Sequence, residues 1–222
     1  MKPIIVDIET IGAPWDSLDE PQREYLTKND EDDEARDKTR DSLALWAPTA
    51  RIVTIAMLNP LSDKGKVYFS AGDSVIDSFN EDNAEYVCVD EKSMLEKFWD
   101  DVQHYAPVIT FNGRCFDGPM LMLRSAMLDV RPSLNLVPYR YDYKSHCDLL
   151  DQLTFYGATR KFNLDMYARA FGIRSPKEEG VTGDQVGTMY ADGKYVDIAR
   201  YCLRDVRATA ELWKRWDYLL KF

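Results

Sequence analysis

Two carboxylates stand in a run of residues that otherwise suits the centre of a sheet. The stretch IVDIET, residues 5–10, contains Asp7 and Glu9 among aliphatic side chains. Residues two apart in a strand project to the same face, so these carboxylates lie side by side and repel each other. A divalent cation removes that repulsion, and carboxylate oxygens suit magnesium or manganese. A strand end that faces solvent is the plainer alternative for this pair.

A third acid interrupts the apolar stripe of a helix predicted near the C-terminus. Apolar residues recur there at spacings of three and four, which indicates one buried helix face. Asp205 occupies a position on this face where an aliphatic residue is expected. Tyr201 lies one turn earlier, so its hydroxyl and the carboxylate can point into the same space. A simple tyrosine–aspartate hydrogen bond at the helix edge would explain the pair equally well.

A fourth acid follows a strand and a turn in the middle of the chain. Asp117 stands in the segment TFNGRCFDGPML, after an Asn-Gly turn and at the start of a predicted helix. Aspartate is a good N-cap residue, so a helix cap is one interpretation. The same side chain can also face a cleft, and the two roles are compatible.

The order of these motifs is more specific than any one of them. D-x-E near the N-terminus, N-G-x-x-F-D mid-chain and Y-x-x-x-D on a late helix resemble the three exonuclease motifs of the DEDD superfamily. The tyrosine four residues before the last aspartate resembles the DEDDy branch. The segments HCDLLDQLTFYG and LDMYARAFGI are similar to those of stand-alone exonucleases related to the proofreading domain of family B DNA polymerases.

This resemblance implies a ribonuclease H-like α/β fold and metal-dependent 3′–5′ exonuclease activity with two Mg²⁺ or Mn²⁺ ions. It implies that Asp7 bridges both ions, that Glu9 and Asp205 help to hold the first, and that Asp117 acts mainly through water on the second. Tyr201 would orient the attacking water. The implied partner is a nucleic acid with a free 3′ end, single-stranded, with DNA favoured over RNA.

Several residues are candidates for substrate contacts. Thr10 and Ile11 follow the first motif, where backbone groups of similar proteins meet the terminal nucleotide. Phe116 can stack on a base or pack in the core, and Asn112 can bind a sugar or phosphate or only build its turn. Further candidates for phosphate contacts are Arg51, Arg114, Lys161 and Lys177.

The elements that must position these residues follow from hydrophobic patterning. Strands are predicted at 3–10, 51–58, 66–70, 86–89 and 107–113. A capping box formed by Ser93 and Glu96 predicts a helix that starts at Ser93. Further helices are predicted from Asp117, at 148–155, at 162–173, between the glycines of TGDQVGTMYADG and at about 195–220. The pattern predicts one α/β domain over 1–222 with a mixed sheet and a helical C-terminal third.

The formal net charge of −10 does not exclude a phosphate-bearing substrate. Residues 14–48 alone hold eleven acids and five bases, and we interpret them as a solvated helical or partly disordered insertion. The rest of the chain has 27 acids and 23 bases, a difference that four clustered carboxylates would account for.

The remaining composition excludes several classes of protein. Four separated cysteines form no CxxC and indicate reduced thiols rather than a zinc site. No stretch has the length of apolar sequence that a membrane helix needs, and no signal peptide precedes the first strand, so we expect a soluble, cytoplasmic protein. Two alternatives stay open, namely a ribonuclease H-like endonuclease and a catalytically inactive nucleic-acid-binding module.

Overall fold

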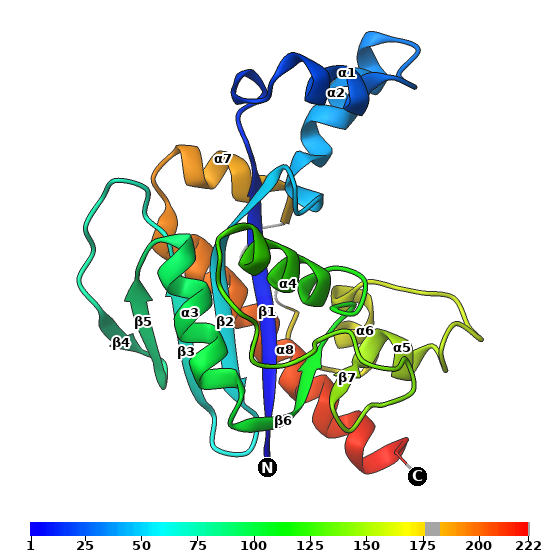
Figure 1. Cartoon of the computed structure of the whole chain (residues 1–222). Helices are drawn as coiled ribbons and strands as arrows, with labels where there is room; N and C mark the ends of the chain where they lie inside the picture. The colour runs from blue at the N-terminus through cyan, green and yellow to red at the C-terminus, as the bar shows by residue number, and fades with distance from the viewer. Residues whose placement is uncertain (176–182, 222) are drawn as a thin grey trace.

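A central mixed sheet organises the molecule. The computed structural model describes residues 1–175 and 183–221, and their strands form a seven-stranded sheet in the order β4-β5-β3-β2-β1-β6-β7. β1 pairs with β2 antiparallel and with β6 parallel, which places it inside the sheet (Figure 1). The strands are β1 (Lys2–Gly12), β2 (Ala50–Asn59), β3 (Lys64–Phe69), β4 (Phe79–Glu81), β5 (Ala84–Cys88), β6 (Tyr105–Thr110) and β7 (His146–Asp148).

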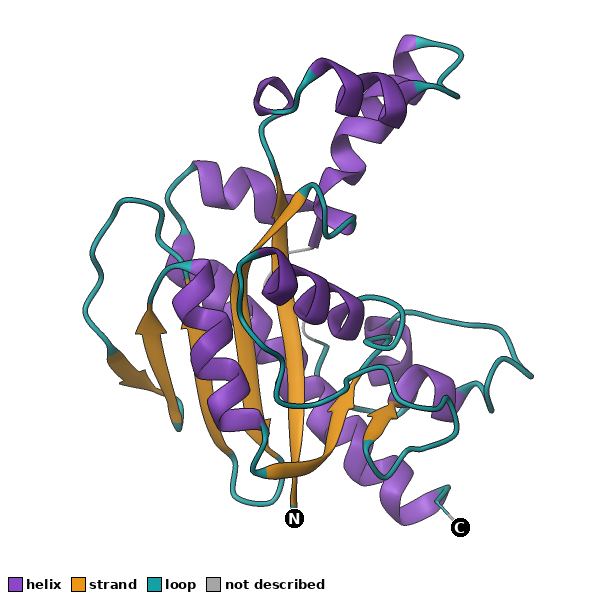
Figure 2. Cartoon of the chain, in the orientation of Figure 1, coloured by secondary structure: helices purple, strands orange, loops and turns teal. Residues whose placement is uncertain are grey.

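Helices lie on both faces of this sheet (Figure 2). The α-helices of the described residues are α1 (Glu20–Thr27), α2 (Asp33–Asp41), α3 (Glu91–Val102), α4 (Asp117–Met127), α5 (Leu149–Leu153), α6 (Leu164–Ala170), α7 (Val186–Ala191) and α8 (Tyr195–Leu219). Short 3₁₀ turns occur at Trp15–Ser17, Ser42–Leu45 and Gly183–Gln185. The predicted α/β class, mixed sheet and helical C-terminal third are confirmed.

The two faces of β1 enter two separate core layers, as the strand alternation requires. Ile4, Val6 and Ile8 pack with the buried side chains of α3 and α4. Ile5 packs on the opposite side with the buried stripe of α8. The face that carries Asp7 and Glu9 is therefore the face that α8 crosses.

Three local details differ from the predicted elements. The stretch between β3 and β5, where no strand was predicted, contains the short strand β4, and the short strand β7 precedes α5 where none was predicted. Three-residue strands are too short to show an alternating pattern, so their pairing is decided by neighbours in the sheet. α3 begins at Glu91 rather than at Ser93, because the carboxylate of Asp90 accepts the backbone N–H of Ser93 and caps the helix.

Residues 14–48 form an acidic helical arm at one end of the sheet (Figure 1). α1 begins with a capping box between Asp19 and Gln22, and Asp32 caps α2 through the backbone N–H of Ala35. Neither helix buries a residue, so their charged side chains stay in water. The helical form of the predicted insertion is confirmed.

Two further expectations concern membranes and thiols. None of the helices in the described residues is both long enough and apolar enough to cross a bilayer. All four cysteines are free; Cys147 and Cys202 are buried, Cys88 is partly buried and Cys115 is exposed. None of the four takes part in a disulfide, and the exposed Cys115 does not pack in the core.

Candidate active site

The first motif presents its carboxylates to α8. Asp7 is partly buried and Glu9 is only 9% exposed. The Sγ–H of Cys202 on α8 lies 3.6 Å from Oδ2 of Asp7 and 3.5 Å from its backbone oxygen, within donating distance of both. Pairing between β1 and β2 changes register after Glu9, because β2 has one extra residue, Val53, opposite this point.

The helix motif supplies the facing groups. Tyr201 is 4% exposed, and its hydroxyl donates to the carboxylate of Asp205 one turn later. Burial, followed by the negative charges of Asp205 and Glu9, raises the pKa of Tyr201 above its ordinary value of 10. The phenol therefore stays protonated at neutral pH, where it acts as a donor and not as a base.

Asp117 reaches the same space from the loop after β6. It is the first residue of α4, and the preceding Phe116 holds the cap position without a side-chain bond, so the N-cap interpretation of Asp117 was wrong. Its side chain is 3% exposed, and Oδ1 has no hydrogen-bond partner within the described residues. A buried carboxylate oxygen without a partner is costly, which points to a ligand at this position.

The four acids lie within electrostatic range of one another. Burial raises the pKa of Asp7 well above its usual value, and the charges of Asp117, Asp205 and Glu9 add to the effect. Burial and then Asp205 and Asp117 raise the pKa of Glu9 in the same way. Segments far apart in the chain thus place like charges within Coulombic range, and a cation would remove the repulsion among them.

The donor set fits hard divalent cations. Carboxylate oxygens from β1, α4 and α8 are the ligands that Mg²⁺ and Mn²⁺ prefer. Ligand atoms of Asp7, Glu9 and Cys202 lie within 4.8 Å of one another. Together with the unpartnered Oδ1 of Asp117, this arrangement can hold cations between the sheet and α8.

The metal-free protein should lose stability as the pH rises. Burial raises the pKa of Asp117 from 3.8 to about 7, so the folded state binds this proton more tightly than the unfolded state does. The contribution of Asp117 is therefore fully present below about pH 4 and is lost as the pH rises toward 7. We expect Asp117→Asn to be more stable than the wild type in chelator at about pH 8, and the difference to shrink at about pH 5.

Urea unfolding of both proteins in EDTA at the two pH values measures this difference. Asp217→Asn, near the C-terminal end of α8, is the matched control for replacing a carboxylate outside the candidate site. An Asp117→Asn stability change that is equal at both pH values would contradict the raised pKa.

The candidate substrate residues have distinct surroundings. The hydroxyl of Thr10 donates to the Ala44 oxygen at 2.7 Å and fastens the helical arm. Ile11 packs beside Tyr201 in a small apolar cluster, which places the end of β1 next to the tyrosine of α8.

Phe116 is partly buried and packs against the core layer of α3 and α4. Asn112 has a φ of 64° and builds the turn before Asp117. Contacts of these four residues with a substrate stay predictions.

The candidate phosphate-binding residues differ in their present partners. Arg51 lies 5.4 Å from the centre of the Tyr190 ring, and Arg114 donates to the Pro138 oxygen. Lys161 is exposed. Lys177 lies outside the described residues.

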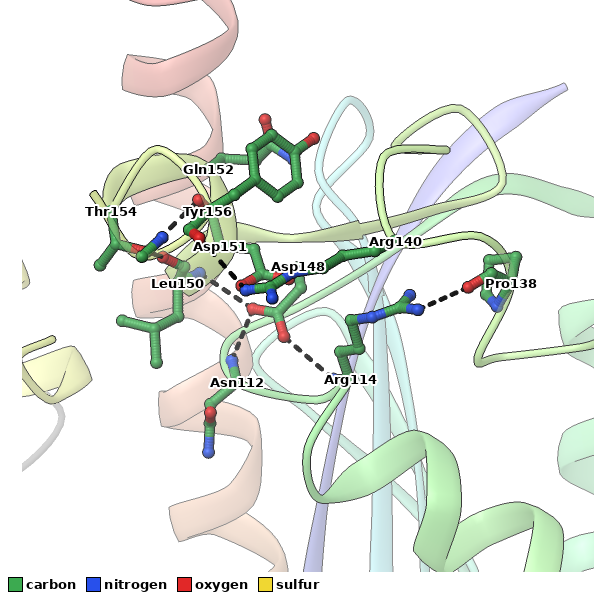
Figure 3. Close-up of polar contacts among 11 residues, drawn as sticks. Asn112, Arg114, Pro138, Arg140, Asp148, Leu150, Asp151, Gln152, Thr154 and Tyr156 are labelled. Atoms are coloured by element: carbon green, nitrogen blue, oxygen red, sulfur yellow. Dashed lines mark hydrogen bonds and ion pairs between the residues drawn. The ribbon is translucent and has the colours of Figure 1, made fainter. Parts of the chain in front are cut away.

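Two residues near the site were missed from the sequence. Cys202 directly follows Tyr201 and contacts Asp7, a pairing that only the tertiary packing shows. Asp148 is 5% exposed and accepts the backbone N–H groups of Asn112, Arg114 and Leu150, each at 2.9 Å (Figure 3). It therefore fixes the loop that delivers Asp117. The only sequence signal for it was an aspartate placed directly before a helix.

Comparisons with known proteins agree with this geometry. Residues 44–220 match a family model described as a predicted 3′-5′ exonuclease related to the exonuclease domain of PolB. The strand with Asp7 and Glu9 precedes the matched range. A search of curated proteins found no match.

Among solved structures, the fold is similar to the family B DNA polymerase from the hyperthermophilic archaeon Pyrobaculum calidifontis. The TM-score is 0.63 at 18% identity, and the match covers 97% of this chain but only 24% of the polymerase. At this identity the likeness concerns the fold alone, and the chain spans about a quarter of the polymerase's length.

Proposed function

Because this chain belongs to the family of predicted 3′-5′ exonucleases related to the exonuclease domain of PolB, we propose that it removes nucleotides from the 3′ end of single-stranded nucleic acid in a metal-dependent reaction. The observation that carries the proposal is the meeting of four carboxylates from β1, α4 and α8 at one buried site. The family's relation to a DNA polymerase domain supports DNA as the preferred substrate over RNA.

In the proposed reaction, water attacks the terminal phosphorus and the 3′ oxygen of the preceding nucleotide leaves, so that a nucleoside 5′-monophosphate is released. Two bound Mg²⁺ or Mn²⁺ ions would activate the water and offset the charge that develops on phosphate and leaving oxygen. Asp7 and Glu9 would hold the ions from the strand, and Asp205 and Asp117 from the two helices.

Tyr201 has a positioning role in this scheme. Its raised pKa keeps the phenol neutral, so it does not remove the proton of the attacking water. Its hydroxyl lies beside Asp205, and it would orient the water through hydrogen bonds. The end of β1, with Thr10 and Ile11, and the loop with Asn112 and Phe116 would flank the terminal nucleotide.

A labelled-substrate assay tests the proposal. With 5′-labelled single-stranded DNA and Mn²⁺ we expect a ladder that shortens from the 3′ end, with weaker activity on single-stranded RNA and on blunt duplex. EDTA should abolish the ladder. A closed single-stranded circle should remain intact, because an exonuclease needs a free end. Cleavage of the circle would indicate an endonuclease, and binding without any hydrolysis would indicate an inactive module; either result would overturn the proposal.

A further inference from the structure

Exposed aromatic side chains are concentrated in one stretch of the chain. Of the seven aromatic residues of the described chain with exposed side chains, four lie within residues 139–162. These are Tyr139, Tyr141, Phe155 and Phe162, which are 74%, 54%, 59% and 38% exposed. A concentration of solvent-exposed aromatic rings is unusual for a surface that contacts only water, and it indicates an interaction surface.

Three of the rings in this region form a continuous array. Tyr139 and Tyr141 meet edge to face with their centres 5.4 Å apart, and Tyr141 meets Tyr156 in the same way at 4.5 Å. The guanidinium of Arg140 lies 6.0 Å from the centre of the Tyr156 ring. We call Tyr139, Arg140, Tyr141 and Tyr156 the aromatic ledge.

The backbone beneath the ledge is held in an unfavourable conformation. Phe155 and Tyr156 are consecutive non-glycine residues with φ of 49° and 59°. Left-handed conformations are rare for aromatic residues and persist where the surroundings impose them. Here the Tyr156 N–H donates to the Asp151 oxygen at 2.7 Å, and Gln152 donates to the Tyr156 hydroxyl at 2.8 Å.

Charge around the ledge suits a polyanion, although the whole chain is acidic. Residues 138–162 contain four cations, all exposed, namely Arg140, Lys144, Arg160 and Lys161. The three carboxylates of the same range differ, because Asp148 and Asp151 are buried and Asp142 is partly buried. Because Arg140 pairs with Asp151, the rest of the exposed charge of this segment comes from Lys144, Arg160, Lys161 and the partly buried Asp142, and it is positive.

The ledge is tied to the loop that carries Asp117 (Figure 3). Asp148 binds the backbone N–H groups of Asn112 and Arg114, and the Arg114 side chain donates to the Pro138 oxygen at 2.6 Å, directly before Tyr139. Arg140 donates to the buried Asp151 at 2.8 Å. Hydrogen bonds thus join the segment that carries the ledge to the loop that precedes Asp117.

We propose that the aromatic ledge binds the single-stranded stretch of nucleic acid that lies upstream of the nucleotide being removed. Bases would stack on the ring faces of Tyr139, Tyr141 and Tyr156, while the surrounding cations face phosphates. Every base has an aromatic face, so this binding is independent of sequence and does not separate DNA from RNA. The assignment of the strand's direction rests on the proposed function.

Binding of an oligothymidylate of about 12 nucleotides and one of about 3 nucleotides to the full chain in EDTA tests this proposal, with fluorescence anisotropy as the readout. The test variant is Tyr139→Ala/Tyr141→Ala, and Tyr139→Phe/Tyr141→Phe keeps the rings. Tyr25→Ala/Tyr218→Ala removes two exposed tyrosines far from the ledge in sequence, at 69% and 86% exposure, and is the matched control.

We expect the alanine double variant to bind the longer oligonucleotide about 10-fold more weakly or worse, and the phenylalanine and control variants to bind it like the wild type. Binding of a blunt duplex should not change, because its bases are not open for stacking. The proposal is overturned if the wild type does not bind the longer strand, if the alanine variant binds it equally well, or if duplex binding falls by the same factor.

This result separates the ledge from the proposed function. Ledge-dependent binding by a protein that hydrolyses nothing with Mn²⁺ would support the ledge and reject the exonuclease. If the wild type hydrolyses DNA normally and the alanine variant binds like the wild type, the exonuclease proposal is supported and the ledge proposal is rejected.

Discussion

Replacing Asp205 by alanine is expected to lower the rate of 3′-end hydrolysis by about a thousandfold or more, because a cation ligand contributes several kcal/mol to the stabilisation of the transition state. Asp205 faces Asp7 and Glu9 across the space between β1 and α8, and its charge raises the pKa of both. Its removal takes away one of the proposed ligands from that side. The same removal relieves repulsion in the metal-free protein, so the fold should survive.

The measurement is the rate of ladder formation on 5′-labelled single-stranded DNA with Mn²⁺, accompanied by thermal unfolding of each variant. Asp217→Ala, a carboxylate on the same helix that pairs with Lys221, is the matched control and should retain activity. Tyr201→Phe keeps the ring and loses the hydroxyl, and we expect a smaller loss of about tenfold to a hundredfold. A ladder of normal rate in Asp205→Ala would reject this site.

Asp148→Ala is expected to produce the largest loss of stability, about 2–5 kcal/mol. Three backbone N–H groups donate to this carboxylate, and each buried donor left without a partner costs about 1–3 kcal/mol before relaxation. The variant also frees the turn at Asn112 that leads to Asp117, so activity should fall although Asp148 is not among the proposed ligands.

Urea unfolding and the ladder assay on the same preparations check this expectation. Asp148→Asn keeps one acceptor oxygen and should lie between the alanine variant and the wild type in both measurements. Asp142→Ala serves as the control, because Asp142 accepts only from Ser145 of its own loop among the side-chain bonds of this segment. Wild-type stability in Asp148→Ala would show that the carboxylate does not hold the loop.

Local patterning determined much of the site in advance. The alternation of a strand was enough to place Asp7 and Glu9 on one face and Ile4, Val6 and Ile8 on the other. The helical period placed Tyr201 and Asp205 on a single face of α8. Both patterns depend only on neighbours in the chain, which is why they can be predicted without tertiary contacts.

Such patterns could not predict the shortest strands or the exact start of a helix. β4 and β7 have three residues each, and their hydrogen bonds come from strands that are distant in sequence. The start of α3 depended on which residue capped the helix. Asp90 accepts the N–H of Ser93, and the Ser93 hydroxyl donates to Asp90 instead of capping a later turn. Alternative N-cap residues change helix stability by about 1 kcal/mol, so a few tertiary contacts are enough to decide between them.

By itself, then, the sequence determined the faces that carry the carboxylates, the acidity of residues 14–48 and the family resemblance, while the helices of the arm came from the structure. Only the tertiary structure decided that α8 crosses the acidic face of β1, that Cys202 contacts Asp7 across 195 positions of sequence, and that Asp148 joins the loop before α4 to the start of α5. The reason is that spacing along a chain fixes which side of an element a residue occupies, whereas the burial of complementary faces fixes which elements meet.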